Sequence, residues 1–158
     1  MKKIIPLFIA LLAVMSACSI NSPPNLNENF LYSCTVNFND ATYNADVDYH
    51  DRVLYFTPTS TNAAGMTISC DGSNVTYSYN NMINSTDMTK VSVSNPAVIL
   101  YEVIGAFYQS DIDKEDDCYT VKGKISAGDF VLKLDSQYNI ISLDISDIDF
   151  SATFSQKN

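Results

Sequence analysis

The chain has 158 residues, of which 46% are hydrophobic, and its nine basic and eighteen acidic side chains give a net charge of −9. An acidic surface repels nucleic acids and anionic lipid headgroups, and no block of Lys or Arg offsets that repulsion, so nucleic acid is excluded as a partner. The length and apolar content are those of a chain that folds around one sizeable core.

The first seventeen residues, "MKKIIPLFIALLAVMSA", are typical of a secretory signal peptide. Lys2 and Lys3 precede an apolar run from Ile4 to Val14, and small residues follow the run. A run of about eleven apolar residues is too short for a bilayer span, which needs ~20. We therefore predict that residues 1–17 are removed and do not belong to the fold.

The residue that follows is Cys18, and "VMSAC" resembles the lipobox of bacterial lipoprotein precursors. The resemblance implies that Cys18 becomes the first residue and carries diacylglycerol on its sulfur, with acyl chains such as palmitate. Two or more acyl chains make membrane attachment stable. It also implies a location outside the cytoplasmic membrane, in the cell envelope. The alternative is ordinary secretion with Cys18 as a plain thiol.

Residues 18–29 are predicted to be the lipidated Cys and a flexible tether. The stretch "SINSPPNLNEN" is rich in Asn and Pro and offers little to bury, and it would reach on the order of 18 Å as a coil. Without the signal peptide, seven basic residues face eighteen acidic ones, a net charge of −11. The anchor, rather than surface charge, would then hold the domain of residues 30–158 at a membrane.

From Phe30 the sequence alternates apolar and polar residues, which predicts strands with one buried face. "FLYSCTVNF" and "ATYNADVDY" flank the turn signal Asn39-Asp40 and read as a hairpin. The segments "RVLYFT", "MTISC" and "VTYSY" follow as three more strands, with Gly72 in the turn between the last two. Five strands that each turn directly into the next predict a meander.

The segment "SNPAVILYEVIGAFYQS" breaks this alternation and predicts a helix from Asn95 to Gln109. Asn95 can cap the helix and Pro96 suits its first position. The helix is apolar nearly all round, with Glu102 as its one charge, so it is buried or in a membrane. Its length of ~22 Å is too short for a ~30 Å hydrocarbon core, which leaves a buried helix.

After an acidic connector, "SDIDKEDD", four more strands are predicted at about 119–125, 129–134, 139–145 and 148–154. The inward phase switches at Ser146-Asp147, which predicts a bulge, bend or tight turn there. About nine strands with one apolar face, and one apolar helix, predict a mainly β (α+β) fold. In this fold a curved antiparallel sheet, an unclosed β-barrel, wraps the helix, because a flat sheet would leave its apolar face wet.

This order of elements resembles the LolA-like and LppX-like lipoproteins over most of residues 30–155. The residues that carry the resemblance are Cys18, "FLYSCTVNFNDATYNADVDY", "SNPAVILYEVIGAF" and "GDFVLKLDSQYNIISLDISDIDFSATFS". It implies an unclosed barrel under a helical lid that holds acyl chains and carries out no covalent chemistry. This chain is shorter than the lipoprotein carriers and has one helix, which leaves open that its own side chains fill the hollow. Its anchor favours a fixed holder over a shuttle.

The predicted ligand surface for a lipid, acyl chain or other hydrophobic ligand is the inward face of the sheet and helix. Its residues are Tyr32, Tyr43, Val47, Tyr55, Ile68, Tyr77, Tyr79, Ile99, Val103 and Phe107. Burying a ten-carbon chain there would contribute roughly 8 kcal/mol at ~0.8 kcal/mol per methylene. The alternative is simple packing of sheet on helix, in an anchored structural or protein-interaction module of the envelope with no ligand.

Catalysis and metal binding find little support in the sequence. His50 is the one histidine and lies in a predicted hairpin turn, so no Ser-His-Asp or Cys-His set can form without it. The acids at 111–117 lack the central Gly and distal Glu of an EF-hand loop. Cys34, Cys70 and Cys118 match no zinc motif. We expect no enzyme activity, no cofactor and no metal.

Two interpretations of Cys34 and Cys70 stay open. Both fall in phase with apolar neighbours, which favours small buried thiols. A disulfide between them would close a loop of roughly 36 residues and stabilise the fold by ~4 kcal/mol.

Overall fold

The computed structural model describes Leu26 and residues 29–157. The predicted signal peptide, Cys18 and most of the predicted tether therefore lie outside the described residues. The predicted fold class is confirmed, because the described residues form one open antiparallel sheet of eleven strands with one α-helix against it.

The strands are β1 Phe30–Phe38, β2 Ala41–His50, β3 Val53–Pro58, β4 Thr67–Cys70, β5 Asn74–Tyr79, β6 Met82–Asp87, β7 Asp111–Glu115, β8 Cys118–Ile125, β9 Gly128–Leu134, β10 Ile140–Ile145 and β11 Phe150–Gln156. The α-helix is α2 Pro96–Ala106, and three 3₁₀ turns are η1 Met88–Lys90, η2 Phe107–Gln109 and η3 Ser146–Ile148. Along the sheet the order is β6-β5-β4-β3-β2-β1-β11-β10-β9-β8-β7. The first and last strands thus pair at the centre, and β6 and β7 form the two edges.

Two-residue turns set the register of three hairpins. Asn39-Asp40, Asp51-Arg52 and Asn80-Asn81 all have positive φ angles, between 46° and 66°. This is the type I′ geometry, whose twist matches that of the strands it joins, and Asn and Asp tolerate it well. The turn after β2 is therefore Asp51-Arg52, and His50 is the last residue of the strand.

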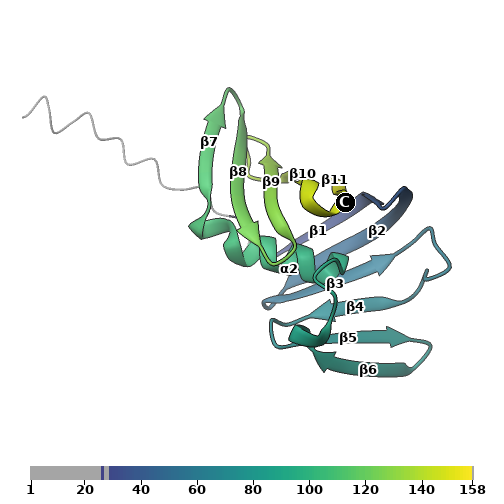
Figure 1. Cartoon of the computed structure of the whole chain (residues 1–158). Helices are drawn as coiled ribbons and strands as arrows, with labels where there is room; N and C mark the ends of the chain where they lie inside the picture. Colours follow the sequence, from purple (N-terminus) through teal and green to yellow (C-terminus); the bar gives the residue numbers. More distant parts are fainter. Residues whose placement is uncertain (1–25, 27–28, 158) are drawn as a thin grey trace, which may run out of the picture.

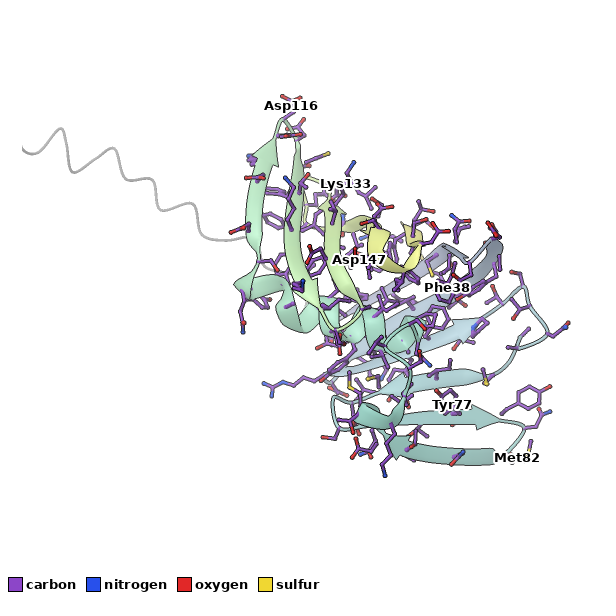
Figure 2. The ribbon with its side chains drawn as sticks, in the orientation of Figure 1. Phe38, Tyr77, Met82, Asp116, Lys133 and Asp147 are labelled. Atoms are coloured by element: carbon purple, nitrogen blue, oxygen red, sulfur yellow. The ribbon has the colours of Figure 1, made fainter. Side chains whose placement is uncertain are left out.

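The two edge strands, β6 and β7, correct the predicted number of about nine strands to eleven. Strand β6, "MINSTD", lacks the apolar alternation of the other strands, and only Asn80-Asn81 signals the hairpin. The predicted acidic connector is in fact edge strand β7 and its turn, with Asp116 at the tip of the β7–β8 hairpin (Figure 2). Exposed acids on an edge oppose pairing with another chain.

The sheet bends around α2, which lies between two groups of strands (Figure 1). The helix contacts β3 and β4 on one side and β8 on the other. It also links the two edges, since the chain passes from β6 through η1 and α2 to η2 and β7. The prediction of a buried helix in a curved sheet is confirmed.

The start of α2 follows the sequence signal. The Oδ1 atom of Asn95 accepts a hydrogen bond of 2.9 Å from the Ala97 N–H, and Pro96 occupies the first turn. The single charge of the helix, Glu102, leaves the core. Its Oε2 atom accepts bonds from the N–H of Ser126, at 3.0 Å, and from the Ser126 hydroxyl, which fastens the helix to the β8–β9 turn.

The predicted switch of inward phase after β10 occurs in a tight turn, as expected. The 3₁₀ turn η3 ends at Asp149, which has a left-handed φ of 50°. Within η3 the Asp147 Oδ2 atom accepts a 3.1 Å hydrogen bond from the N–H of Asp129, so the turn is held against β9.

The core holds the inner faces of sheet and helix. Its largest fully buried side chains include Phe56, Phe107, Phe130 and Phe150. Cys34 and Cys70 are buried and unbridged, which corresponds to the first of the two interpretations, and Cys118 is exposed. Over residues 29–157 and Leu26, no helix is long and apolar enough to cross a membrane.

Replacing Ile99 by Ala should lower the free energy of unfolding by about 2–5 kcal/mol, because it leaves a cavity at a residue that is 0% exposed. Urea unfolding measures the effect. Ile141→Ala deletes the same atoms at a position that is 39% exposed, and should cost about 1 kcal/mol or less. Equal losses in the two variants would contradict the burial of α2.

Candidate ligand site

Most of the predicted ligand-site residues meet in one apolar cluster. Tyr32, Val47 and Ile68 are buried on the inner face of the sheet, and Tyr43 and Tyr77 are partly buried beside them. The helix contributes Ile99, Val103 and Phe107, all buried. The alternation of the strands and the apolar helix sequence therefore placed these eight residues correctly. Their role in binding a ligand stays a prediction.

Tyr55 and Tyr79 do not belong to this cluster. Tyr55 pairs with Asp48 and Ser69 on the outer face, where its ring stacks on His50 at 4.8 Å. The predicted inward position of Tyr55 was wrong, because "RVLYFT" is apolar in both phases and Leu54 and Phe56 occupy the inner one. Tyr79 is 42% exposed at the end of β5, where it pairs with Met82 of the edge strand.

The inner tyrosines use their hydroxyls to hold the fold together. The Tyr32 hydroxyl accepts a 3.2 Å bond from the N–H of Ile140, and the Tyr77 hydroxyl accepts a 3.0 Å bond from the Asn95 side chain. Burial raises the pKa of Tyr32, and it raises the pKa of Tyr43 to about 12. These groups therefore stay neutral phenols at physiological pH.

Between sheet and helix the hollow is almost completely filled by side chains. The remaining cavity measures about 10 Å³, which is at the limit for a single water molecule. Its lining residues are Leu26, Phe30, Val47, Leu54, Leu100, Val103, Ile104, Leu132, Ile140 and Phe154. Of these, the sequence-based site contained only Val47 and Val103.

Leu26 lies inside the core, although it belongs to the predicted tether. It is 5% exposed and packs in the same cluster as the sheet and helix. The only sequence signal is a single Leu among polar residues in "SPPNLNEN", which is too short to show a period.

A second cavity adjoins the hollow at this point. It measures about 400 Å³ and shares the walls Leu26 and Ile104 with the smaller cavity. Its other lining residues are Asn29, Tyr49, Asp51, Arg52 and Tyr108. We call it the mouth cavity. Its volume lies in the range of small-molecule sites, ~300–1,000 Å³, and its wall combines aromatic rings with charges of both signs.

Arg52 is the one arginine of the chain, and its positive charge acts to lower the pKa of two nearby tyrosines, Tyr49 and Tyr101. Burial raises the pKa of Tyr49, and the positive charge of Arg52 opposes that rise. Burial likewise raises the pKa of Tyr101, which packs over the β4–β5 turn at Gly72. A cation close to both phenols makes the rim of the mouth cavity polar, while its floor at Leu26 and Ile104 is apolar.

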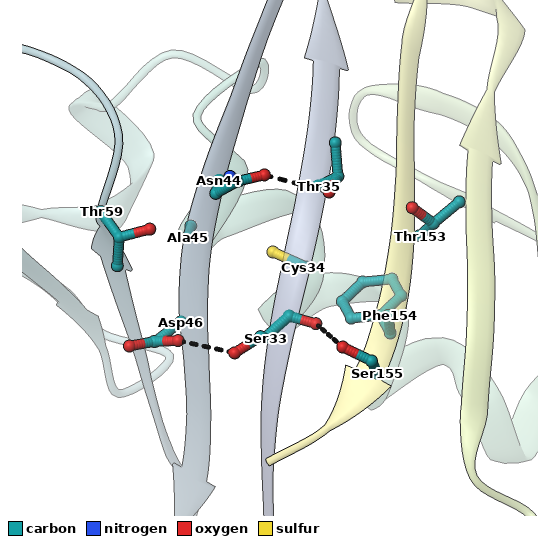
Figure 3. Close-up of a pocket in the computed structure, with 10 residues that line it drawn as sticks. All are labelled: Ser33, Cys34, Thr35, Asn44, Ala45, Asp46, Thr59, Thr153, Phe154 and Ser155. Atoms are coloured by element: carbon teal, nitrogen blue, oxygen red, sulfur yellow. Dashed lines mark hydrogen bonds between the residues drawn. The ribbon is translucent and has the colours of Figure 1, made fainter.

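Two further cavities lie away from the hollow. One of about 330 Å³ lies on the outer face of β1, β2 and β11, where the Ser33 hydroxyl donates to Asp46 and that of Thr35 to Asn44, both at 3.0 Å (Figure 3). Hydrogen bonds from Lys157 lower the pKa of Asp46. The other, of about 590 Å³, lies beside β7–β9, where Lys122 pairs with Asp113. In both, some of the polar side chains in the wall are already engaged in hydrogen bonds or ion pairs within the protein.

Catalytic machinery is not evident around these cavities. The Nδ1 atom of His50 lies 3.0 Å from Asp48 Oδ1 on the outer face, stacked against Tyr55. Within the part of the chain that the structure describes, no group of three His, Cys, Asp or Glu residues could hold a metal ion. The absence of enzyme activity and of a cofactor remains an expectation from the sequence.

Comparison with known proteins finds similarity among solved structures alone. No protein-family model matches the sequence. No curated protein matches it. Among solved structures, the lipoprotein LppX of Mycobacterium tuberculosis is similar, with 14% identity over 92% of this chain and 93% of LppX. The TM-score is 0.41, a likeness too slight to carry an inference about function.

Alkaline pH should destabilise the fold through the buried phenols. Because the pKa of Tyr43 is raised to about 12 when folded, its contribution is complete below pH 10 and is lost as pH rises from about 10 to 12. In Tyr43→Phe, the fall of the unfolding free energy above pH 10 should be shallower than in the parent chain. Urea unfolding at pH 7, 10 and 11 measures this, and identical pH profiles would contradict burial of the hydroxyl.

Proposed function

We propose that this protein is a non-enzymatic lipoprotein of the bacterial cell envelope that binds a lipid, acyl chain or other apolar ligand between the curved sheet and α2. The observation that carries the proposal is that the two cavities lie next to each other. An apolar hollow adjoins a mouth cavity of about 400 Å³, and Leu26 and Ile104 are the residues that border both.

The chemistry of the mouth suits an amphiphilic ligand. Its apolar floor would receive methylene groups, each worth ~0.8 kcal/mol on burial. Its rim carries Tyr49, Tyr108, Asp51 and Arg52, which offer aromatic surface with polar tips and both signs of charge to a headgroup. An apolar chain with a polar end would thus find both environments within one site.

Anchoring through Cys18 forms the second half of the proposal. The support is the sequence of a charged start, an apolar run and small residues directly before Cys18. An acylated Cys18 would hold the domain at the outer side of the cytoplasmic membrane or elsewhere in the envelope. A tethered protein of this kind would retain a ligand at the membrane rather than carry it away.

A second function is favoured by the filled hollow. Because the cavity between sheet and helix measures about 10 Å³, the domain could serve as an anchored structural or protein-interaction module without a ligand. In that case the apolar inner face contributes stability alone, and a partner would meet the acidic outer surface.

Acylation predicts a defined N-terminus. In a bacterium that processes lipoproteins, the purified chain should begin at Cys18 and carry the added mass of diacylglycerol, and Cys18→Ser should release the protein from the membrane fraction. Mass spectrometry of the N-terminal peptide and membrane fractionation measure both. A membrane-bound Cys18→Ser protein, or an unmodified thiol at Cys18, would contradict the anchor.

Ligand binding predicts copurified lipid in Cys18→Ser protein, which lacks the predicted acyl chains of its own. Native mass spectrometry and organic extraction should show a bound apolar molecule, and added lauric acid should raise the melting temperature. Ile104→Gln puts an amide in the wall of both cavities and should reduce the thermal shift. Ile141→Gln, on the exposed outer face, should leave it unchanged.

Absence of copurified lipid together with absence of a thermal shift would refute the ligand function and favour the packed module.

A further inference from the structure

We infer that Leu26 occupies an acyl-chain site, and that a single-chain amphiphile binds by displacing it, which frees the segment before β1. The inference rests on the proposed function, because it assumes that an apolar ligand enters the hollow. It adds the class of ligand, the place of entry and a link between ligand binding and the tether.

The Leu26 side chain lies between the two cavities, and we call it the plug. It lines both the 10 Å³ remnant of the hollow and the mouth cavity, and it is 5% exposed. Its neighbours in the hollow are apolar and come from the sheet, such as Phe30 and Ile140, and from the helix, such as Leu100. A branched alkyl side chain in such a site presents the same chemistry as the end of an acyl chain.

Among the residues that line the small cavity, Leu26 alone belongs to no strand or helix. Leu26 precedes β1, whose pairing begins at Phe30 with Tyr49, and no backbone hydrogen bond joins Leu26 to the other described residues. The remaining wall residues belong to β1, β2, β3, β9, β10 and β11 or to α2. Displacing one of them would break ladder or helix hydrogen bonds, whereas withdrawing Leu26 gives up the burial of its side chain and breaks no ladder or helix hydrogen bond among the described residues.

Withdrawal of Leu26 would change the reach of the anchored domain. Leu26 lies eight residues after the predicted anchor Cys18, a span of at most about 27 Å even when fully extended. With Leu26 buried, the mouth cavity is therefore kept close to the membrane surface. Once Leu26 is released, the first residue held in a strand is Phe30, twelve residues after Cys18, and the maximal span to that residue is about 40 Å.

Ligand binding and burial of Leu26 would compete for the same site, so each would weaken the other by the same factor. If ligand and plug exclude each other, the apparent affinity for ligand is reduced by the fraction of molecules in which Leu26 is bound. Removing the plug must then strengthen ligand binding, and ligand must expose the plug.

The test uses full-length Cys18→Ser protein and lauroyl lysophosphatidylcholine below its micellar concentration, followed by isothermal titration calorimetry. Leu26→Ala should bind about tenfold more tightly than the parent chain, or about 1.4 kcal/mol. Leu31→Ala is the matched control, since Leu31 is 43% exposed on the outer face of β1, and it should bind like the parent.

A second measurement follows the plug itself and does not depend on how well Leu26→Ala folds. The chain contains no Trp, so Leu26→Trp introduces a single reporter. Its emission should shift to longer wavelength as ligand is added, because the indole moves from the core into water. The emission of Leu31→Trp should stay constant.

The outcomes separate the two proposals. Ligand that binds equally well to the parent and to Leu26→Ala, with no emission shift in Leu26→Trp, overturns the plug and leaves the ligand function standing. Failure of every variant to bind the lysolipid or lauric acid overturns the ligand function, and the plug with it.

Discussion

Burial of the helix α2 is the constraint on which the rest of the structure depends. Five of its eleven residues are buried, and its apolar side chains surround most of its circumference, so one flat layer cannot cover it. Contacts with β3 and β4 on one side and β8 on the other show that the sheet has to bend to reach both sides. The curvature of the sheet is thus a consequence of the composition of one segment.

Bending an open sheet leaves two edges, β6 and β7. Strand β7 protects its edge with exposed acids, while β6 is short and mostly polar. Beside the mouth cavity, Leu26 completes the wall of the hollow, although it lies outside the sheet. If a ligand displaces Leu26, as we propose, a packed core and a ligand site are two states of one architecture that differ in the position of this side chain.

The sequence predicts those parts of this fold in which a local pattern repeats. Alternation places Tyr32, Cys34 and Val36 on the inner face, and Asn95 with Pro96 marks the start of the helix. The alternation is absent from the edge strands β6 and β7, whose side chains are mostly exposed. It is ambiguous around Tyr55, because β3 is apolar in both phases. The burial of Leu26 could not be predicted, because a single apolar residue in a polar segment shows no repeating pattern. It is fixed by tertiary packing alone.

Native-state hydrogen exchange of α2 tests the central claim most directly. If the helix is the core around which the sheet bends, the amide protons of residues 100–106 should exchange only through global unfolding, as slowly as those of the central strand β1. Exchange of these amides orders of magnitude faster than in β1, and insensitive to mutations that lower global stability, would show a helix that detaches from the sheet. That result would contradict the account.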